Sequence, residues 1–275
     1  MREAQGRKAW SGILRWAWLV VILLVLVVLV FSTWRSRRGS GRQDGAWQRI
    51  QEEGVLRVGM DASYPPFEWI DERGEFVGYD VDLARELARR WGVEPQFVNV
   101  HFDGLYDALE AEKVDLLISA LPHDRAMTQD VVYSEPYFNA GQVLVVARGD
   151  TSMRSVEDLD GRCVGVELGA RSHQWVRQLA RDQGLSVEIV TGRHPENVFA
   201  FLEEGSADAV ICDRVTAYGY MKGRALRIVD PPLTNAPFVM AGRADSRLLM
   251  KKVDEALGAW REVGFLADLE ERWLR

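Results

Sequence analysis

The sequence has few of the residues that metal sites, disulfide scaffolds and most catalytic centres require. Its 275 residues include only two cysteines, Cys163 and Cys212, which lie far apart in apolar, strand-like runs. Their spacing fits no metal motif, and we interpret them as small buried side chains rather than as a disulfide. The four histidines are scattered, and no G-x-S-x-G, H-E-x-x-H, Walker or C-x-x-C motif occurs. We therefore expect no metal, no cofactor and no enzyme activity.

Basic charge is also scarce outside the N-terminal segment. The net charge of the chain is −7, and residues 1–43 hold eight Lys or Arg against one Glu. The remainder has 26 basic and 40 acidic residues, a net charge of −14. Nucleic-acid binding needs a basic footprint, so this acidic body argues against a nucleic-acid partner. It is only a weak indication of a cationic ligand, since surface charge also keeps a protein soluble.

Only one long hydrophobic run is present. Residues 16–31 form 16 consecutive apolar residues, and the run reaches 19 residues at Trp34. At about 1.5 Å per helical residue, this length nearly crosses a hydrocarbon core of roughly 30 Å. No A-x-A-like cleavage site and no lipid-accepting cysteine follow it. We predict a short N-terminal segment (1–15), a transmembrane signal anchor (16–34) and a polar linker (35–46); a cleaved signal peptide is the alternative.

The rest of the chain alternates predicted strands with predicted helices. The pattern predicts strands over residues 55–60, 96–100 and 114–118, and helices over 47–53, 80–91 and 104–112, with Asp80 as a helix cap. Such an alternation predicts a largely parallel sheet covered by helices. In α/β sheets of this kind, ligands bind outside the carboxyl ends of the strands. Four residues follow predicted strands and are therefore expected at a cleft: Asp61, Ser119, Gly169 and Asp213.

Several motifs occur in the order in which a known family carries them. They are LRVGMDASYPPFEWIDERGEFVGYDVDL, VDLLISALP, SEPY and ADAVICD. Together they resemble the family 3 extracellular solute-binding proteins, which deliver polar amino acids to ABC transporters. The resemblance implies a two-lobed α/β fold of the periplasmic-binding-protein-like type II, with a cleft and a two-strand hinge. Residues 47–147 and 229–275 would form lobe 1, and residues 148–228 would form lobe 2.

The resemblance also implies a set of ligand-binding residues. Asp213 matches the acid that receives the α-amino group of a ligand, and Asp61 adds a second carboxylate at a strand end. Tyr64 and Phe102 match the two aromatic residues that flank the ligand side chain. Backbone groups of three successive residues would line the floor: Ser119, Ala120 and Leu121. For the acids the alternative is a helix cap or a surface charge, and for the aromatics it is core packing.

One departure from the family pattern concerns the carboxylate of the ligand. Counted back from Ser134, the arginine of the family falls at Met127, so the clamp for a carboxylate is missing there. Arg125 lies two residues earlier and is one candidate replacement. The pair Ala170 and Arg171 stands where the family has Gly followed by Ser or Thr, which makes Arg171 a second candidate. The alternative for both arginines is a solvated surface charge.

These features predict a monomeric, membrane-tethered solute-binding protein on the extracytoplasmic side. It would capture a small polar amino acid or amine-like solute and release it to ABC permease subunits, as the resemblance implies. Two alternatives stay open. The first is an enzyme resembling the cyclohexadienyl dehydratases, which share this fold, and the second is a ligand-sensing module without transport.

Overall fold

The computed structural model describes residues 45–127 and 129–275. The predicted transmembrane segment, residues 16–34, lies outside the described residues, as do the predicted N-terminal segment and nearly all of the linker. In the part of the chain that is described, no helix is long and apolar enough to cross a membrane.

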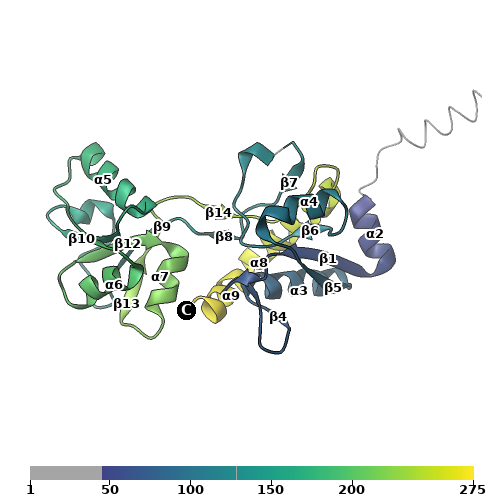
Figure 1. Ribbon diagram of the computed structural model, residues 1–275, viewed down its shortest axis with the longest axis horizontal. Helices are drawn as coiled ribbons and strands as arrows, with labels where there is room; N and C mark the ends of the chain where they lie inside the picture. Colours follow the sequence, from purple (N-terminus) through teal and green to yellow (C-terminus); the bar gives the residue numbers. More distant parts are fainter. Residues whose placement is uncertain (1–44, 128) are drawn as a thin grey trace, which may run out of the picture. The chain divides into compact units, whose positions relative to one another are not determined.

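The first sheet has five strands in the order β5-β1-β6-β15-β7 (Figure 1). β1 pairs in parallel with β5 and with β6, whereas β15 pairs antiparallel with β6 and β7. We call this sheet, with the helices packed on it, lobe 1. Its strands are β1 (Val55–Met60), β5 (Glu94–Asn99), β6 (Leu116–Leu117), β7 (Val131–Tyr133) and β15 (Ala241–Arg243). Its helices are α2 (Gly45–Glu53), α3 (Tyr79–Trp91), α4 (Leu105–Glu110), α8 (Arg247–Glu262) and α9 (Phe265–Trp273).

The second sheet repeats this arrangement, in the order β11-β10-β12-β9-β13. β10 pairs in parallel with β11 and β12, and β9 pairs antiparallel with β12 and β13. We call this sheet, with its helices, lobe 2. Its strands are β9 (Gln142–Ala147), β10 (Cys163–Glu167), β11 (Glu188–Gly192), β12 (Ala209–Asp213) and β13 (Leu226–Val229). Its helices are α5 (Arg171–Gln183), α6 (Pro195–Glu203) and α7 (Arg214–Met221).

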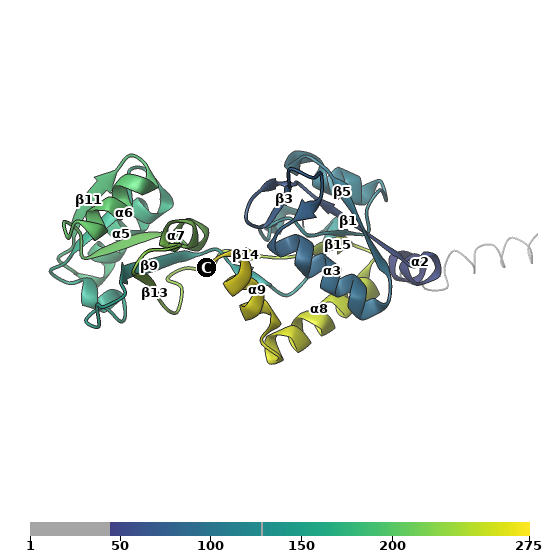
Figure 2. The same ribbon diagram turned by 90° about the horizontal axis from the view of Figure 1, so that it is seen from below.

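Alternate residues of the lobe 1 strands face two separate hydrophobic clusters. Leu116 of β6 packs with α3, α8 and α9, and the next residue, Leu117, packs with α4. This follows from the strand itself, since successive side chains point to opposite faces of a sheet. Figure 2 shows α3 and α8 on the same side of β1 and β15.

Lobe 2 is built in the same way. Leu144 and Val146 of β9 pack in the cluster that contains α5, whereas Val143 and Val145 pack with α6 and α7. All four side chains are fully buried. Each lobe therefore has its own core, with helices on both faces of its sheet.

Two short strands join the lobes, namely β8 (Phe138–Asn139) and β14 (Pro237–Phe238), which pair antiparallel. Pro122 forms an isolated bridge with Phe238 beside them. The predicted lobe boundary at residue 148 falls after β9, yet β9 is a central strand of the second sheet. Residues 143–146 of β9 are fully buried, and the strand pairs with β12 and β13, so it lies inside lobe 2.

Local predictions differ from the structure at two places, and a third feature was not predicted. α3 begins at Tyr79 with Gly78 as its N-cap, so the prediction that Asp80 caps this helix is wrong. Of the predicted strand over residues 114–118, only Leu116 and Leu117 pair with neighbouring strands, as β6. The stretch before α3 forms a small antiparallel sheet of β2 (Ser63–Tyr64), β3 (Glu68–Ile70) and β4 (Phe76–Val77).

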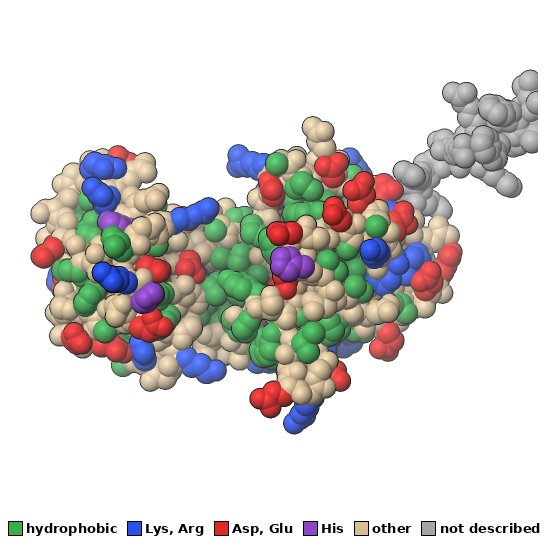
Figure 3. Space-filling model, in the orientation of Figure 1, with side chains coloured by type: hydrophobic (Ala, Val, Ile, Leu, Met, Phe, Trp, Pro, Cys, Tyr) green, Lys and Arg blue, Asp and Glu red, His purple; other side chains and the backbone are tan. Residues whose placement is uncertain are grey.

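Charged side chains are scattered over the face drawn in Figure 3, with basic groups interspersed among acidic ones. This face carries no continuous basic field of the kind that neutralises phosphates.

Candidate ligand-binding site

One pocket lies in lobe 1, at the carboxyl ends of β1 and β6, and has a volume of about 370 Å³. It is lined by Asp61, Ser63, Tyr64, Glu68, Phe102, Ser119, Ala120, Pro122 and Phe238. None of these nine residues is a lysine or an arginine. Strand-end loops supply most of the lining, as expected for the crevice of an α/β sheet.

Asp61 directly follows β1, and its carboxylate already accepts two hydrogen bonds. Ser63 Oγ donates to Oδ1 at 2.7 Å, and the backbone N–H of Phe102 donates to Oδ2 at 2.8 Å. These bonds fix the loops after β1 and β5 relative to each other. Because each carboxylate oxygen has two lone pairs, the group can still accept from a ligand.

Tyr64 and Phe102 place aromatic rings over this pocket. Each is 44% exposed, so neither is a core residue. The ring of Tyr64 stacks on the buried Phe67 with centroids 5.8 Å apart and an angle of 12° between the planes. The half-exposed rings offer a flat apolar wall, or a face for a cation.

The floor of the pocket is held by hydrogen bonds from below. Ser119 Oγ accepts the backbone N–H of Asp61 at 2.9 Å and donates to Glu68 Oε1 at 2.7 Å. Ala120 has a positive φ of 42°, which is uncommon for a residue with a side chain, and its N–H donates to Asp80 Oδ2 at 2.6 Å. The hydroxyl of Ser119 therefore has no proton left to donate to a ligand. Asp80 stabilises the positive-φ backbone of Ala120.

Glu68 and Asp80 form a buried carboxyl pair beneath this floor, at 1% and 0% exposure. Burial raises the pKa of both groups, and the charge of Asp80 raises the pKa of Glu68 further. Asp80 receives donors from Ala120 and from the hydroxyl of Tyr137, at 2.8 Å, and these stabilise its charged form. Glu68 Oε2 and Asp80 Oδ1 have no donor among the described residues, and a proton retained on one acid would let it donate to the other.

A glycine brings the two acids together. Gly78 has a φ of 132°, and a Cβ there would lie 2.2 Å from the carbonyl oxygen of Phe67. Only glycine allows the chain to pass this close. The N–H of Asp80 then donates to that carbonyl at 2.9 Å, which sets Asp80 beside Glu68.

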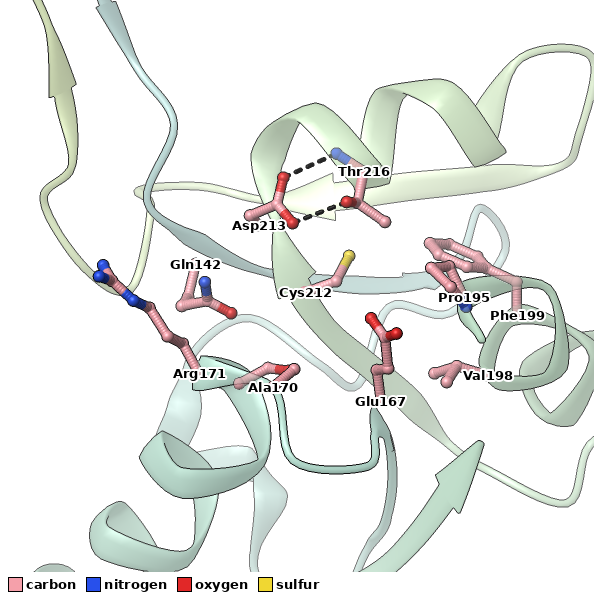
Figure 4. A pocket seen from close by; sticks show the side chains of 11 residues that line it. Gln142, Glu167, Ala170, Arg171, Pro195, Val198, Phe199, Cys212, Asp213 and Thr216 are labelled. Atoms are coloured by element: carbon pink, nitrogen blue, oxygen red, sulfur yellow. Dashed lines mark hydrogen bonds between the residues drawn. The ribbon is translucent and has the colours of Figure 1, made fainter. Parts of the chain in front are cut away.

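A second pocket, of about 200 Å³, lies in lobe 2 at the carboxyl ends of β10 and β12 (Figure 4). Its polar lining includes Gln142, Glu167, Arg171, Asp213 and Thr216. The remaining lining residues of this pocket are Ala170, Ser172, Pro195, Val198, Phe199 and Cys212. Two carboxylates therefore border one small cavity with an apolar wall.

Asp213 caps α7 and borders the pocket at the same time. Its Oδ1 accepts the backbone N–H of Thr216 at 2.8 Å, and its Oδ2 accepts the hydroxyl of Thr216 at 2.6 Å (Figure 4). The alternative role as a helix cap is thus realised, and it leaves lone pairs free on both oxygens.

The pockets bring together eight of the ten predicted ligand residues. The first pocket contains Asp61, Tyr64, Phe102, Ser119 and Ala120, and the second contains Ala170, Arg171 and Asp213. Leu121 and Arg125 line neither. Leu121 is 1% exposed in the cluster with α4, and Arg125 lies in an exposed 3-10 turn. Met127, at the position of the family arginine, packs against the same cluster as Leu121.

Sequence reasoning missed Glu167, Gln142, Pro122 and Phe238. Glu167 ends β10, so the rule of strand ends could have found it; the predicted strand-end residue was Gly169, two positions later. Phe238 reaches the first pocket from a distant part of the chain, and no local signal marks it.

The cysteines form no disulfide, and both are partly buried. Cys212 lies in the second pocket, where burial and the charge of Asp213 raise its thiol pKa well above the usual value. The thiol is therefore uncharged at neutral pH. No group of three or more His, Cys, Asp or Glu side chains within the described residues is arranged to hold a metal ion.

Two lobes of matching topology, two connecting strands and pockets at strand ends define a periplasmic-binding-protein-like ligand-binding protein. Comparison with known families agrees: the bacterial extracellular solute-binding proteins, family 3, match residues 56–275, and the chain belongs to this family.

Individual relatives differ in the ligands that their names state. The L-cystine-binding protein TcyJ of Escherichia coli strain K12 is 28% identical over 233 residues, which cover 84% of this chain and 86% of that protein. The ABC transporter arginine-binding protein 1 of the same strain is 30% identical over 224 residues, covering 79% and 90%. A crystal structure of an ancestral cyclohexadienyl dehydratase has a TM-score of 0.73 and 28% identity, covering 82% and 95%.

Proposed function

We propose that this protein captures a small polar amino acid or amine-like solute on the extracytoplasmic side and delivers it to an ABC importer. The observation that carries the proposal is the pair of strand-end pockets, each with a carboxylate that keeps free lone pairs: Asp61 in lobe 1 and Asp213 in lobe 2. A carboxylate in a partly dry cavity binds an ammonium group through charge-assisted hydrogen bonds. The cystine- and arginine-binding relatives support the same class of solute.

In this proposal one solute contacts both lobes when they close around it. Tyr64 and Phe102 contact its apolar part, and the acids contact its amine groups. Closure is driven only by the better contacts that the solute makes in the closed state. The segment at residues 16–34 tethers the protein to the membrane, so that the monomer works beside its permease.

Ligand-induced stabilisation of the full chain, purified in detergent, tests the proposal. At a solute concentration 100-fold above the dissociation constant, the free energy of unfolding should rise by about 2.7 kcal/mol. Small-angle scattering should show compaction with the same solute. A panel of amino acids and amines that leaves the unfolding temperature unchanged would contradict the proposed function.

A dehydratase is the second candidate, favoured by the ancestral dehydratase among the structural neighbours. Prephenate carries two carboxylates, which call for arginine partners, and the pocket of lobe 1 has no cationic side chain. Incubation of the protein with prephenate distinguishes the two, since the binding function predicts no product. A sensing role without transport is the third candidate, and genes for a permease and an ATPase beside this gene would argue against it.

A further inference from the structure

The pocket of lobe 2 presents three hydrogen-bond acceptors that lack a matching cation. The carboxylate of Glu167 forms no hydrogen bond or ion pair within residues 45–127 and 129–275. The amide oxygen of Gln142 is fully buried and likewise accepts none from the described residues. Asp213 keeps one lone pair on each oxygen beyond its bonds to Thr216. Figure 4 shows Glu167 directed into the cavity below Cys212.

Arg171 is the cationic side chain in the lining of this pocket, and it forms no ion pair with these acceptors. Arg171 is exposed, and Figure 4 shows its side chain running away from Glu167, beyond Gln142. The other wall is apolar, formed by Pro195, Val198 and Phe199. An unpaired carboxylate against such a wall is unfavourable until a cation binds, because the low polarity weakens its solvation.

An anion is the competing occupant, since α5, α6 and α7 all begin at this pocket and each N-terminus carries about half a positive charge. The structure weakens the ends of α6 and α7 as anion sites, and at α5 it occupies the N–H groups that precede the helix. Asp213 already caps α7, and α6 begins with Pro195, which has no N–H. Before α5, the N–H of Gly169 donates to His173 Nδ1, and the N–H of Ala170 donates to the carbonyl of Glu167. Two full carboxylate charges outweigh the partial charges that remain.

Resting on the proposed function, we propose that the solute is an amine without a carboxylate beside its ammonium group, and that Glu167 and Gln142 complete its site with Asp213. An ammonium has three N–H donors, which match the three acceptors. A carboxylate on the neighbouring carbon would lie close to Glu167 and be repelled. The pocket of lobe 1 offers such a carboxylate no cation either, because no lysine or arginine lines it and Met127 packs against the cluster with α4.

Two matched pairs of probes test this inference with the full chain in detergent: agmatine against L-arginine, and cadaverine against L-lysine. Within each pair the molecules differ only in the α-carboxylate. Titration calorimetry should show at least about 10-fold tighter binding of each decarboxylated amine. Glu167→Gln should weaken agmatine binding by about 30-fold or more, because a buried cation loses its charged partner. The same variant should lower the preference for agmatine over arginine, since the repulsion is removed.

The matched control is Glu188→Gln, an exposed acid of lobe 2 outside the pocket, which should change neither affinity nor preference. Gln142→Leu is a second variant that removes an acceptor without altering charge, and it should weaken agmatine by about 5- to 10-fold. The inference would be overturned if L-arginine or L-lysine bound more tightly than its decarboxylated amine. It would also be overturned if a neutral amino acid bound more tightly than any amine. Either result would leave the proposed function standing. An equal loss of affinity for the amine and its amino acid in Glu167→Gln would also overturn the inference. If no amine and no amino acid binds the wild type, the proposed function itself fails.

Discussion

Lobe 1 and lobe 2 each hold a pair of carboxyl groups near the end of a central strand, and the two pairs differ in their surroundings. Glu68 and Asp80 lie in the core and receive donors from Ser119, Ala120 and Tyr137. Glu167 and Asp213 border a cavity, and only Asp213 has protein donors. The first pair supports the backbone under a pocket, whereas the second pair remains available to a ligand.

This difference shows that the chemistry of a carboxyl group depends on its surroundings more than on its sequence neighbours. Burial without a cation disfavours ionisation, so the pKa of both groups in lobe 1 is raised. A carboxylate beside a cavity can exchange water for an ammonium group. Four variants test this division of roles.

The largest expected effect is on stability, from Asp80→Ala. This change leaves the N–H of Ala120, the hydroxyl of Tyr137 and the proton of Glu68 without their acceptor. Loss of such a buried network should lower the free energy of unfolding by about 3–5 kcal/mol in urea titrations. Glu72→Ala, at an exposed turn, is the control and should change it by less than about 0.5 kcal/mol. A small loss for Asp80→Ala would mean that the pair is not structural.

The next effect is on binding, from Asp213→Ala. A bound ammonium would lose a charged acceptor, which costs about 2–5 kcal/mol, so calorimetry should detect no binding of the preferred solute. Stability should fall less, by about 1 kcal/mol, because only the cap of α7 is lost. Asp182→Ala, an exposed acid on α5, should leave both quantities unchanged. Unchanged affinity in Asp213→Ala would remove Asp213 from the site.

Glu68→Gln should alter the dependence of stability on pH. Folding raises the pKa of Asp80 from 3.8 to about 7 and that of Glu68 from 4.5 to about 11, mainly through burial. A group whose pKa is higher in the folded state contributes its full stabilisation when the pH is below its pKa in the unfolded state. This stabilisation is lost as the pH rises toward the pKa of the group in the folded state. One retained proton corresponds to about 1.4 kcal/mol per pH unit between pH 5 and 7.

The glutamine at position 68 would keep a donor for Asp80 and an acceptor for Ser119 without titrating. The variant should therefore lose less stability than the wild type as the pH rises from 5 to 7, by about 1 kcal/mol per unit. Urea titrations at three pH values measure this slope. Equal slopes for the two proteins would show that the pair does not retain a proton on folding.

The smallest expected effect comes from Ser119→Ala. The hydroxyl links the pair of lobe 1 to the pocket, since it binds both Glu68 and the N–H of Asp61. Its loss should cost about 1–2 kcal/mol of stability and weaken solute binding only several-fold, through displacement of Asp61. Ser63→Ala offers a comparison, because its hydroxyl binds the carboxylate of Asp61 in an exposed loop and should matter less for stability. A larger binding defect than that of Asp213→Ala would indicate direct contact between Ser119 and the ligand.

Local patterns in the sequence were sufficient for much of the fold. β1 was predicted over residues 55–60, as the structure has it, because an apolar run bounded by polar residues is a short-range signal. The strand-end rule placed Asp61, Ser119 and Asp213 at pockets, and the order of motifs indicated the family that the comparison then showed. What these predictions share is that their information lies within a few neighbouring residues.

Contacts between distant residues decided the rest. Asp80 looked like a helix cap, but its partners Ala120 and Tyr137 are 40 and 57 residues away, and only the assembled core shows that it is buried. The backbone of Leu121 was expected on the floor of the pocket, and the sequence did not indicate that its side chain would pack in the cluster with α4. The role of Glu167 depends on Gln142 and Asp213, which reach the same cavity from two other strands of lobe 2. The sequence by itself determined β1 and the family, because these depend on local patterns. Which carboxyl groups are buried together and which border a cavity was decided only by the tertiary structure, because burial and hydrogen-bond partners come from residues far apart in the chain.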